Sequence, residues 1–246
     1  MILAIAAAVA AAAPASVAAP SSAPAAACPD VVTPDAMVCR ALEQQKNGNA
    51  AGAAQAFEEA ARASPEKDPK TARMFAAAGN LWIAAGQAGK AALALDKALS
   101  LPGLEAEQRG EALLDRARAA ESQGDLTTAR ARLNEAAATI SGDPFYWYFS
   151  AALAIREADT AKAQAAIAKA LALAPSEPTI LFEAGHVAHF ADDDARARYY
   201  WERAAANDPN GAVGKSAREA LAMLPAPTTI VTQPQPAKPK AHQPKS

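Results

Sequence analysis

The sequence predicts an all-α protein, a solenoid of about five stacked helix–turn–helix units closed by a C-terminal capping helix. Alanine, the strongest helix former and a poor strand former, supplies 73 of the 246 residues. One pattern of large, small and turn residues recurs five times between residues 34 and 211, and prolines follow several copies and stop their second helix. With so few larger apolar residues, we expect neither a β-sandwich or barrel nor one large apolar core.

Residues 1–27 are expected to be a leader that directs export, which would place the mature protein in the periplasm. They contain no charged side chain, and residues 2–13 form an apolar run of the length found in a secretory signal, ended by Pro14. Small residues then offer cleavage sites after Ala18 or after Ala27. The positively charged start of such signals is missing, so an upstream start or a simple Ala/Pro/Ser leader stays open as an alternative.

Two cysteines follow the leader: Cys28 in a linker over residues 28–33, and Cys39. An even pair in an exported chain is a candidate disulfide, and closing so short a loop should stabilise the fold by about 2–3 kcal/mol. Alternatively, Cys28 becomes the first mature residue and carries a lipid, because residues 25–28 resemble a bacterial lipoprotein box that lacks its usual leucine. Two unreacted thiols are the third alternative. A disulfide and a lipid exclude each other at Cys28, and the lipid would tether the N-terminus to a membrane.

The repeated pattern begins with a large residue, then has a small residue four positions on and a turn residue seven further on. An alanine, a large apolar residue and a second alanine follow at intervals of five, four and three, often with a proline five later. The first copy reads Met37, Ala41, Gly48, Ala53, Phe57, Ala60 and Pro65, and the fifth reads Leu181, Gly185, Asp192, Ala197, Trp201, Ala204 and Pro209. The copies start near residues 34, 72, 110, 144 and 178.

These residue types have a physical reason at these positions. Small residues such as Gly79 let the two helices of a unit approach closely, and large ones such as Phe57 fill the space between units. Two copies depart from the pattern, with Ala158 and Asp192 at the turn that is glycine in the other three. Four extra residues in the first and second periods should lengthen the loops around 66–71 and 102–109 or extend a helix by one turn.

This pattern resembles the tetratricopeptide repeat (TPR) family over about residues 34–211, because the 34-residue unit of that family has the same order of large, small and turn positions. The resemblance implies a right-handed superhelix whose concave face is lined by the first helix of each unit. It also implies that extended peptides or helices of other proteins bind along that groove.

The groove-facing spacing of the family identifies candidate partner-binding residues. Ten of the thirteen aromatic residues lie between residues 145 and 201, and an exposed aromatic cluster usually marks a contact site. The candidates are Phe145, Tyr148, Ile155, Arg156, Phe182, His186, His189 and Phe190, together with Asn80 and Arg118. The alternative is a narrow groove in which these rings pack on each other, and Trp147 and Trp201 are expected in the core.

The ligand expected for this groove is an apolar or aromatic segment. Family members that hold the terminal carboxylate of a peptide use interleaved Lys, Arg and Asn residues, a set that Asn80 and Arg118 alone do not rebuild. His186 and His189 could ligate a metal with Asp192–Asp194 only if a third ligand and supporting residues were present. We therefore expect no metal, and we expect these acids to cap the following helix.

Two further segments complete the array. Residues 212–224 are expected to form the capping helix, with Val213, Ala217, Leu221 and Leu224 on its inner stripe. Residues 225–246 carry six prolines, three lysines and no acid, a composition typical of a disordered tail. Such a tail would make the protein more soluble or tether it weakly to anionic envelope material.

The composition also limits the function. A net charge of −2 and a pI near 6.0 argue against nucleic acid as the partner. The sequence has no Gly-rich phosphate loop, zinc-ligand spacing or nucleophile motif, so neither a cofactor nor a catalytic residue is expected. We expect a non-catalytic scaffold that binds other proteins or peptides in the cell envelope. The alternative is a membrane-tethered subunit, lipidated or oligomeric, of an envelope assembly, secretion or maturation complex, and the sequence does not specify an oligomeric state.

Overall fold

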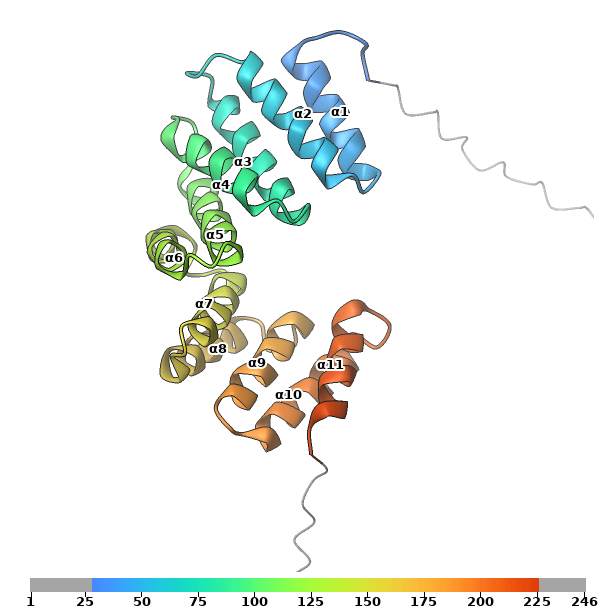
Figure 1. Ribbon diagram of the computed structural model, residues 1–246, viewed down its shortest axis with the longest axis vertical. Coiled ribbons are helices and arrows are strands. Elements are labelled where there is room, and N and C mark those ends of the chain that lie inside the picture. Colours follow the sequence, from blue (N-terminus) through green and yellow to red (C-terminus); the bar gives the residue numbers. More distant parts are fainter. Residues whose placement is uncertain (1–27, 226–246) are drawn as a thin grey trace, which may run out of the picture.

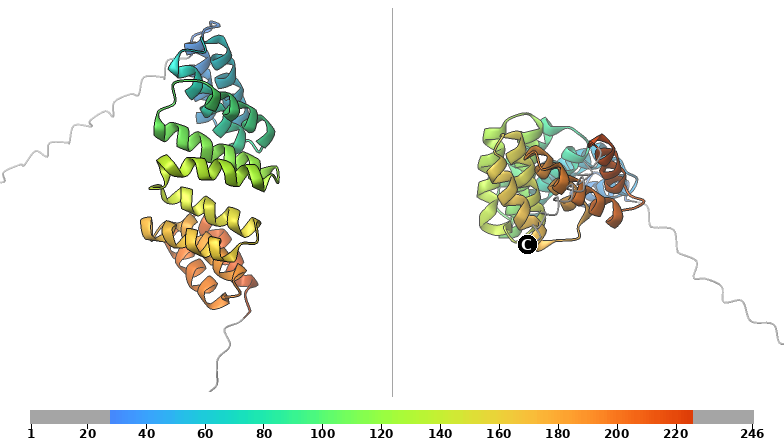
Figure 2. Two further views of the ribbon diagram at one scale, coloured as in Figure 1. Left: turned by 90° about the vertical axis from the view of Figure 1, so that its left-hand side faces the viewer. Right: turned by 90° about the horizontal axis from the view of Figure 1, so that it is seen from below.

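The computed structural model describes residues 28–225, so the leader (1–27) and the tail (226–246) lie outside the described residues. Within the described residues the chain folds into eleven α-helices and no strand, which confirms the all-α solenoid predicted from the sequence. The helices follow an arc, with α1 and α2 at one end and α11 at the other (Figure 1). The left-hand view of Figure 2 shows the helices stacked as successive layers.

The first ten helices form five antiparallel pairs. Their bounds are α1 Pro34–Lys46, α2 Ala50–Ala63, α3 Pro69–Ala84, α4 Ala88–Ser100, α5 Ala106–Ser122, α6 Leu126–Ile140, α7 Pro144–Arg156, α8 Thr160–Leu173, α9 Pro178–Phe190 and α10 Asp194–Asn207. The last helix, α11, spans Ala212–Met223 and packs against α10 and α9.

All five pairs close with the same turn, whose middle residue has a positive φ. Glycine occupies this position in the first three units, and Ala158 and Asp192 occupy it in the last two, at φ 57° and 58°. The residue after the turn donates its N–H to a carbonyl five positions earlier, as Asp159 does to Ala154 at 2.9 Å. This bond satisfies a carbonyl that the helix end would otherwise leave free. The turns therefore lie at the residues that the repeat pattern predicts.

The second and third units begin earlier than the repeat spacing predicts. α3 begins at Pro69 and α5 at Ala106, instead of near residues 72 and 110. The extra residues lengthen the first helices, to 16 residues in α3 and 17 in α5, compared with 13 in α1, α7 and α9. The side chain of Asp68 caps α3, and Glu105 and Gln108 form a capping box at the start of α5. The extra residues were expected to lengthen either a loop or a helix, and in the structure they lengthen the helix.

Small residues face large ones inside each unit. A Cβ at Gly79 would overlap Leu95 of α4, and one at Gly185 would overlap the indole of Trp201 on α10. Alanine fills most other interior positions, and the buried residues form four successive apolar clusters along the arc. Trp201 is buried, as expected, while Trp147 is only partly buried between two of the clusters.

The capping helix buries a face that differs slightly from the expected one. Ala217 and Leu224 are buried, whereas Val213 and Leu221 are only partly buried. Gly214 takes the innermost position, because it lies so close to the backbone of Asp208 that a Cβ would overlap the carbonyl oxygen. This close approach rotates the inner face of α11 by one residue toward Gly214.

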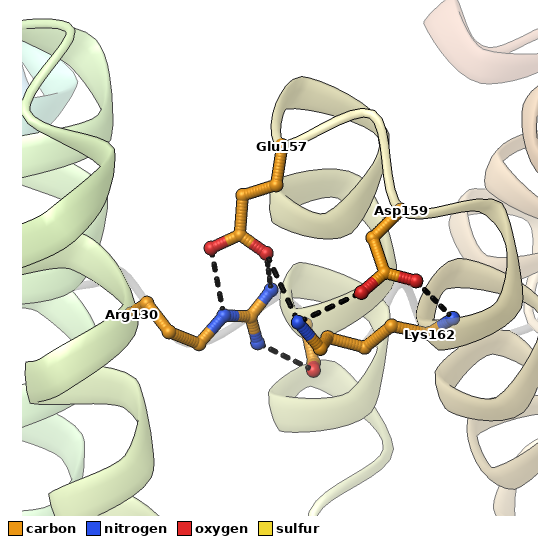
Figure 3. Close-up of polar contacts among 5 residues, drawn as sticks. Arg130, Glu157, Asp159 and Lys162 are labelled. Atoms are coloured by element: carbon orange, nitrogen blue, oxygen red, sulfur yellow. Dashed lines mark hydrogen bonds and ion pairs between the residues drawn. The ribbon is translucent and has the colours of Figure 1, made fainter.

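The junction between the third and fourth units is held by polar contacts (Figure 3). Arg130 of α6 donates from Nε and Nη2 to the two carboxylate oxygens of Glu157, at 2.9 and 2.7 Å, and from Nη1 to Ser150 Oγ at 3.3 Å. Lys162 Nζ of α8 lies 3.7 Å from Glu157 and 2.9 Å from Asp159. The Arg130 and Glu157 side chains are each only 18% exposed, so this bidentate pair is sheltered from water.

Candidate functional site

Successive first helices contact one another along the arc, α3 with α5, α5 with α7 and α7 with α9. Figure 1 shows α5 on the inner side of the arc relative to α6. Polar contacts run directly between successive first helices: Asn80 of α3 donates to Asp115 of α5 at 2.8 Å, and Arg156 of α7 forms an ion pair with Glu121 of α5. The inner face of α3, α5 and α7 is therefore one continuous surface.

The largest hollow on this face, about 660 Å³, lies between the first and second units. Val38, Phe57, Met74 and Ala77 give it an apolar lining. Charged side chains of both signs also border it, namely Asp35, Asp68, Lys70 and Arg73. This hollow can accept a bulky apolar side chain of a ligand. The polar side chains at its border can hydrogen-bond to the ligand's backbone.

Two smaller hollows continue the line. The second, about 300 Å³, lies between α3 and α5 and shares Arg73 and Ala77 with the first. The third, about 280 Å³, lies between α5 and α7, with Tyr148 and Ala152 in its lining. Asp115 borders the second hollow and Arg118 the third, and the two side chains form an ion pair at 2.9 Å. Together the three hollows make a trough across four successive first helices, which we call the inner trough.

The middle of the inner trough is acidic. Glu111 of α5 is exposed, lines the second hollow and forms no ion pair within residues 28–225. Partial burial raises the pKa of its carboxyl, and the negative charges of Glu107, Asp115 and Asp143 raise that pKa further. Carboxylates outnumber cations in the lining of this hollow, Glu111 and Asp115 against Arg73, whose guanidinium lies 3.5 Å from the Glu105 carboxylate.

The candidate residues of the second to fourth units lie along the inner trough. Asn80 and Arg118 are brought together because both hydrogen-bond to the carboxylate of Asp115, at 2.8 and 2.9 Å. Tyr148 is half-buried in the third hollow, and its burial, followed by the charge of Glu183, raises the pKa of its hydroxyl. The hydroxyl therefore stays protonated at neutral pH and can donate a hydrogen bond.

The remaining candidates of α7 lie beside Tyr148. Phe145 is 44% exposed and makes an edge-on contact with the Tyr148 ring, at 6.3 Å between centroids. Ile155 is partly buried against the apolar cluster of α7, α8 and α9. Arg156 is held in its ion pair with Glu121. An exposed aromatic side chain thus flanks the C-terminal end of the trough.

The candidates of the fifth unit gather around Trp201. The ring centroid of His186 lies 4.4 Å from that of Phe182 and 5.5 Å from that of Trp201, and the His189 centroid lies 5.9 Å from Trp201. His189 Nδ1 is also 2.7 Å from Asp194 Oδ1, and Phe190 is 38% exposed. In this unit the rings pack on each other, which is the alternative that the sequence left open.

No metal-binding set emerges from these histidines. Asp193 caps α10 by accepting from the Arg196 N–H at 2.9 Å, as expected for this acidic run. Within residues 28–225 there is no group of three or more His, Cys, Asp or Glu side chains placed to hold a metal ion.

The linker is tied to the first helix. Cys28 and Cys39 form a disulfide. Arg40 donates to the backbone carbonyls of Pro29 at 2.9 Å and Val31 at 3.2 Å. These contacts fix the start of the described chain against α1.

Two residues of the N-terminal part of the inner trough were not expected there. Phe57 was assigned to packing between units, and it is indeed buried, but Phe57 and Met74 also border the largest hollow. Asp115, which joins Asn80 to Arg118, was not identified either. Ala76 and Ala77 were the available signal, because small side chains leave space opposite a neighbouring helix.

The pairing of helices, the repeated turn and the small-to-large contacts define a TPR-type solenoid. Solved structures with the same fold include PilW, described as a widely conserved type IV pilus biogenesis factor, at 18% identity and a TM-score of 0.64 over 77% of this chain and 84% of that chain. YrrB, described as a TPR protein with an unusual peptide-binding site, has 16% identity and a TM-score of 0.52 over 75% and 91%. A tetratricopeptide repeat protein from Parabacteroides merdae has 17% identity and a TM-score of 0.59 over 77% and 70%.

At these identities the likeness establishes the fold, and the chain is a TPR solenoid. No protein-family model matches the chain, and no curated protein matches it by sequence.

Proposed function

We propose that this protein is a non-catalytic scaffold that binds a segment of another protein along the inner trough. The observation that supports this most directly is the line of hollows of about 660, 300 and 280 Å³ between successive first helices. Helices that pack side by side are about 10 Å apart, close to the rise of about 9 Å over three residues of a polyproline-type chain, in which every third side chain lies on the same face. A peptide crossing the helices can therefore place one side chain in each hollow at intervals of three residues.

The lining favours an apolar or aromatic segment. Phe57 and Met74 offer apolar contact in the first hollow, and Ile83 and Tyr148 do so in the third. Phe145, 44% exposed beside Tyr148, can contact a residue that leaves the trough. The peptide-binding site for which YrrB is described is consistent with such a use of this fold.

We place the protein in the cell envelope after export. The apolar leader supports this, and so does the Cys28–Cys39 disulfide, since disulfides persist in oxidising compartments. The disulfide occupies the sulfur that a lipid at Cys28 would need, so the proposal takes an unlipidated chain. Among residues 28–225, no helix is both long and apolar enough to span a bilayer. PilW, described as a pilus biogenesis factor, makes envelope assembly complexes the first place to look for a partner.

The location is tested by the intact mass of protein purified from the envelope fraction of its native host, alkylated with and without prior reduction. The expected result is a chain that lacks a leader and gains two alkyl groups only after reduction. A chain that starts at Cys28 with added lipid mass would overturn the proposed location and favour the membrane-tethered subunit.

The inner trough is tested by a photo-crosslinking amino acid at Ala152 in the third hollow. Leu93, 73% exposed on α4, is the control because it borders none of the three hollows. Adducts with a partner are expected at position 152 and not at position 93. Equal adducts at both positions would refute the trough as the binding site.

The captured partner then allows a measurement of affinity. Tyr148→Ala should weaken binding by about 1–2 kcal/mol, the loss typical of an aromatic contact residue. Tyr199→Ala removes a tyrosine that is 54% exposed on α10 and should leave the affinity unchanged. Unchanged affinity in the Tyr148 variant would move the contact away from the third hollow.

A further inference from the structure

The middle of the inner trough carries carboxylates that the described residues do not neutralise. Glu107, Glu111 and Asp115 are spaced four residues apart on α5, so they share one face of the helix. Glu111 and Asp115 line the second hollow, and Glu107 lies one turn before them, beside the hollow. Asp115 is paired with Arg118, whereas Glu107 and Glu111 form no ion pair among residues 28–225. Asp143, which caps α7, adds its charge to the surroundings of Glu111. A ligand that brings positive charge is the natural complement of this surface.

The chain itself contains such a ligand. Residues 226–246 hold three lysines and no acid, and residues 1–27 hold no charged side chain. The remaining 21 basic and 26 acidic side chains therefore lie in residues 28–225, which carry a net charge of −5 beside a tail of +3. The body and the tail therefore attract each other, and a carboxylate without an ion pair can accept a lysine without losing a partner.

We propose that the chain's own C-terminal segment docks in the second hollow of the inner trough, with Lys238 and Lys240 facing Glu107 and Glu111. The tail then occupies the site that an external partner would enter. The proposal extends the proposed function, because it gives the same trough an internal occupant that a partner must displace.

The tail is long enough to reach this hollow within one molecule. Its anchor is Pro225, whose carbonyl accepts a hydrogen bond from Arg198 of α10 at 2.7 Å. Thirteen residues separate Pro225 from Lys238 and can span about 43 Å when extended. α11 packs on α9, and α7 and α5 follow along the inner face, so α5 lies about three helix spacings, or roughly 30 Å, away.

The spacing of the charges also matches. Prolines at 234, 236 and 239 favour a polyproline-type conformation, which rises about 3.1 Å per residue and would place Lys238 and Lys240 about 6 Å apart. Four residues of helix rise by about 6 Å as well, which is the axial separation of Glu107 and Glu111, so the match applies to a tail that crosses to α5 and then turns along its axis. Ala76 and Ala77 on the α3 side of the hollow leave room for slender lysine side chains.

Carbodiimide cross-linking of the full chain tests this docking, because it joins a lysine directly to a carboxylate in contact with it. A mixture of 14N- and 15N-labelled protein distinguishes links within one molecule from links between two. We expect links from Lys238 and Lys240 to Glu107 and Glu111, within one isotope, that disappear at about 1 M salt, where charges more than about 3 Å apart are screened.

Glu111→Gln is the diagnostic variant, since it leaves the Glu107 carboxylate available for cross-linking. It should lower the yield of tail links to Glu107 several-fold. Glu202→Gln is the matched control, because Glu202 is exposed on α10 and forms no ion pair among residues 28–225, and it should leave that yield unchanged. Tail links to Glu202 as frequent as those to Glu111 would overturn the proposal. Links found only between different isotopes would overturn it in favour of a second copy as the occupant.

The outcome is separable from that of the proposed function. Partner adducts at position 152 without tail links would refute the tail docking and leave the proposed function standing. Tail links without partner adducts would refute the proposed function and leave the docking standing.

Discussion

The second unit (α3 and α4) and the fifth unit (α9 and α10) place a glycine and a large side chain at the same two positions of the repeat, yet their inner faces differ. Gly79 lies under Leu95, and Ala76 and Ala77 beside it border open hollows. Gly185 lies under Trp201, whose indole donates to the Phe182 carbonyl at 3.0 Å and contacts the rings of the neighbouring histidines. In the fifth unit, the inner aromatic residues pack around the larger ring of Trp201.

This comparison shows why a density of aromatic residues does not locate an open groove in this fold. Rings close together pack on each other and fill the space between them. Space for a ligand remains where the side chains are small. The N-terminal units therefore contain the open hollows of the inner trough. The fourth unit adds aromatic contacts, from Tyr148 and Phe145, at the C-terminal end of the trough.

The strongest test of the comparison removes the ring itself. Trp201→Ala should lower the free energy of unfolding by about 3–5 kcal/mol, and Leu95→Ala, at the equivalent position, by about 2–4 kcal/mol. Urea denaturation followed by circular dichroism measures both. A larger loss for Leu95→Ala would show that the aromatic cluster is not the better-packed region.

The two ends of the array are closed by different means, a disulfide at α1 and the helix α11 at α10. Replacing both Cys28 and Cys39 by serine should cost about 2–3 kcal/mol, because the short loop is no longer closed in the unfolded chain. Hydrogen exchange should quicken in α1 and stay unchanged in α9. Equal acceleration in both helices would mean that the array unfolds as one unit.

The Arg130–Glu157 pair joins the third unit to the fourth. Arg130→Met should destabilise the protein by about 1–3 kcal/mol, because it removes charged hydrogen bonds from a Glu157 side chain that is only 18% exposed. Arg132→Met, on the same helix, removes an exposed pair with Glu135 and should cost less than about 0.5 kcal/mol. Thermal denaturation of the two variants makes the comparison, and similar losses would show that shelter from water is unimportant here.

The smallest effect concerns the turns that distinguish the last two units from the first three. Ala158 has φ 57°, a strained conformation for alanine, so Ala158→Gly should stabilise the protein by about 0.5–1 kcal/mol. That gain corresponds to a rise of about 2 °C in Tm. Gly124→Ala, at the equivalent turn of the third unit, should have the opposite sign. A loss of stability for Ala158→Gly would indicate that the alanine makes contacts that compensate for its backbone strain.

Much of the fold follows from short stretches of sequence. The turns at Gly48 and Ala158 follow from the repeat pattern, because each depends on residues within one unit. The large residues were expected between units, whereas Trp201 also packs on Gly185 of its own unit. The helix extension at Pro69 was one of two expected outcomes, since the extra residues could equally have lengthened a loop. The capping face of α11 was only partly anticipated, because the close approach of Gly214 to Asp208 depends on backbone geometry.

The sequence by itself determined the helical units, their order and their turns, since backbone conformation and side-chain volume within a unit are local properties. Only the tertiary structure decided where the inner face is open and which charges are paired. Asn80 meets Asp115 from 35 residues away, and Arg156 meets Glu121 across the same interval. Such contacts depend on how one unit is oriented on the next, and that orientation results from the packing of every interface between them.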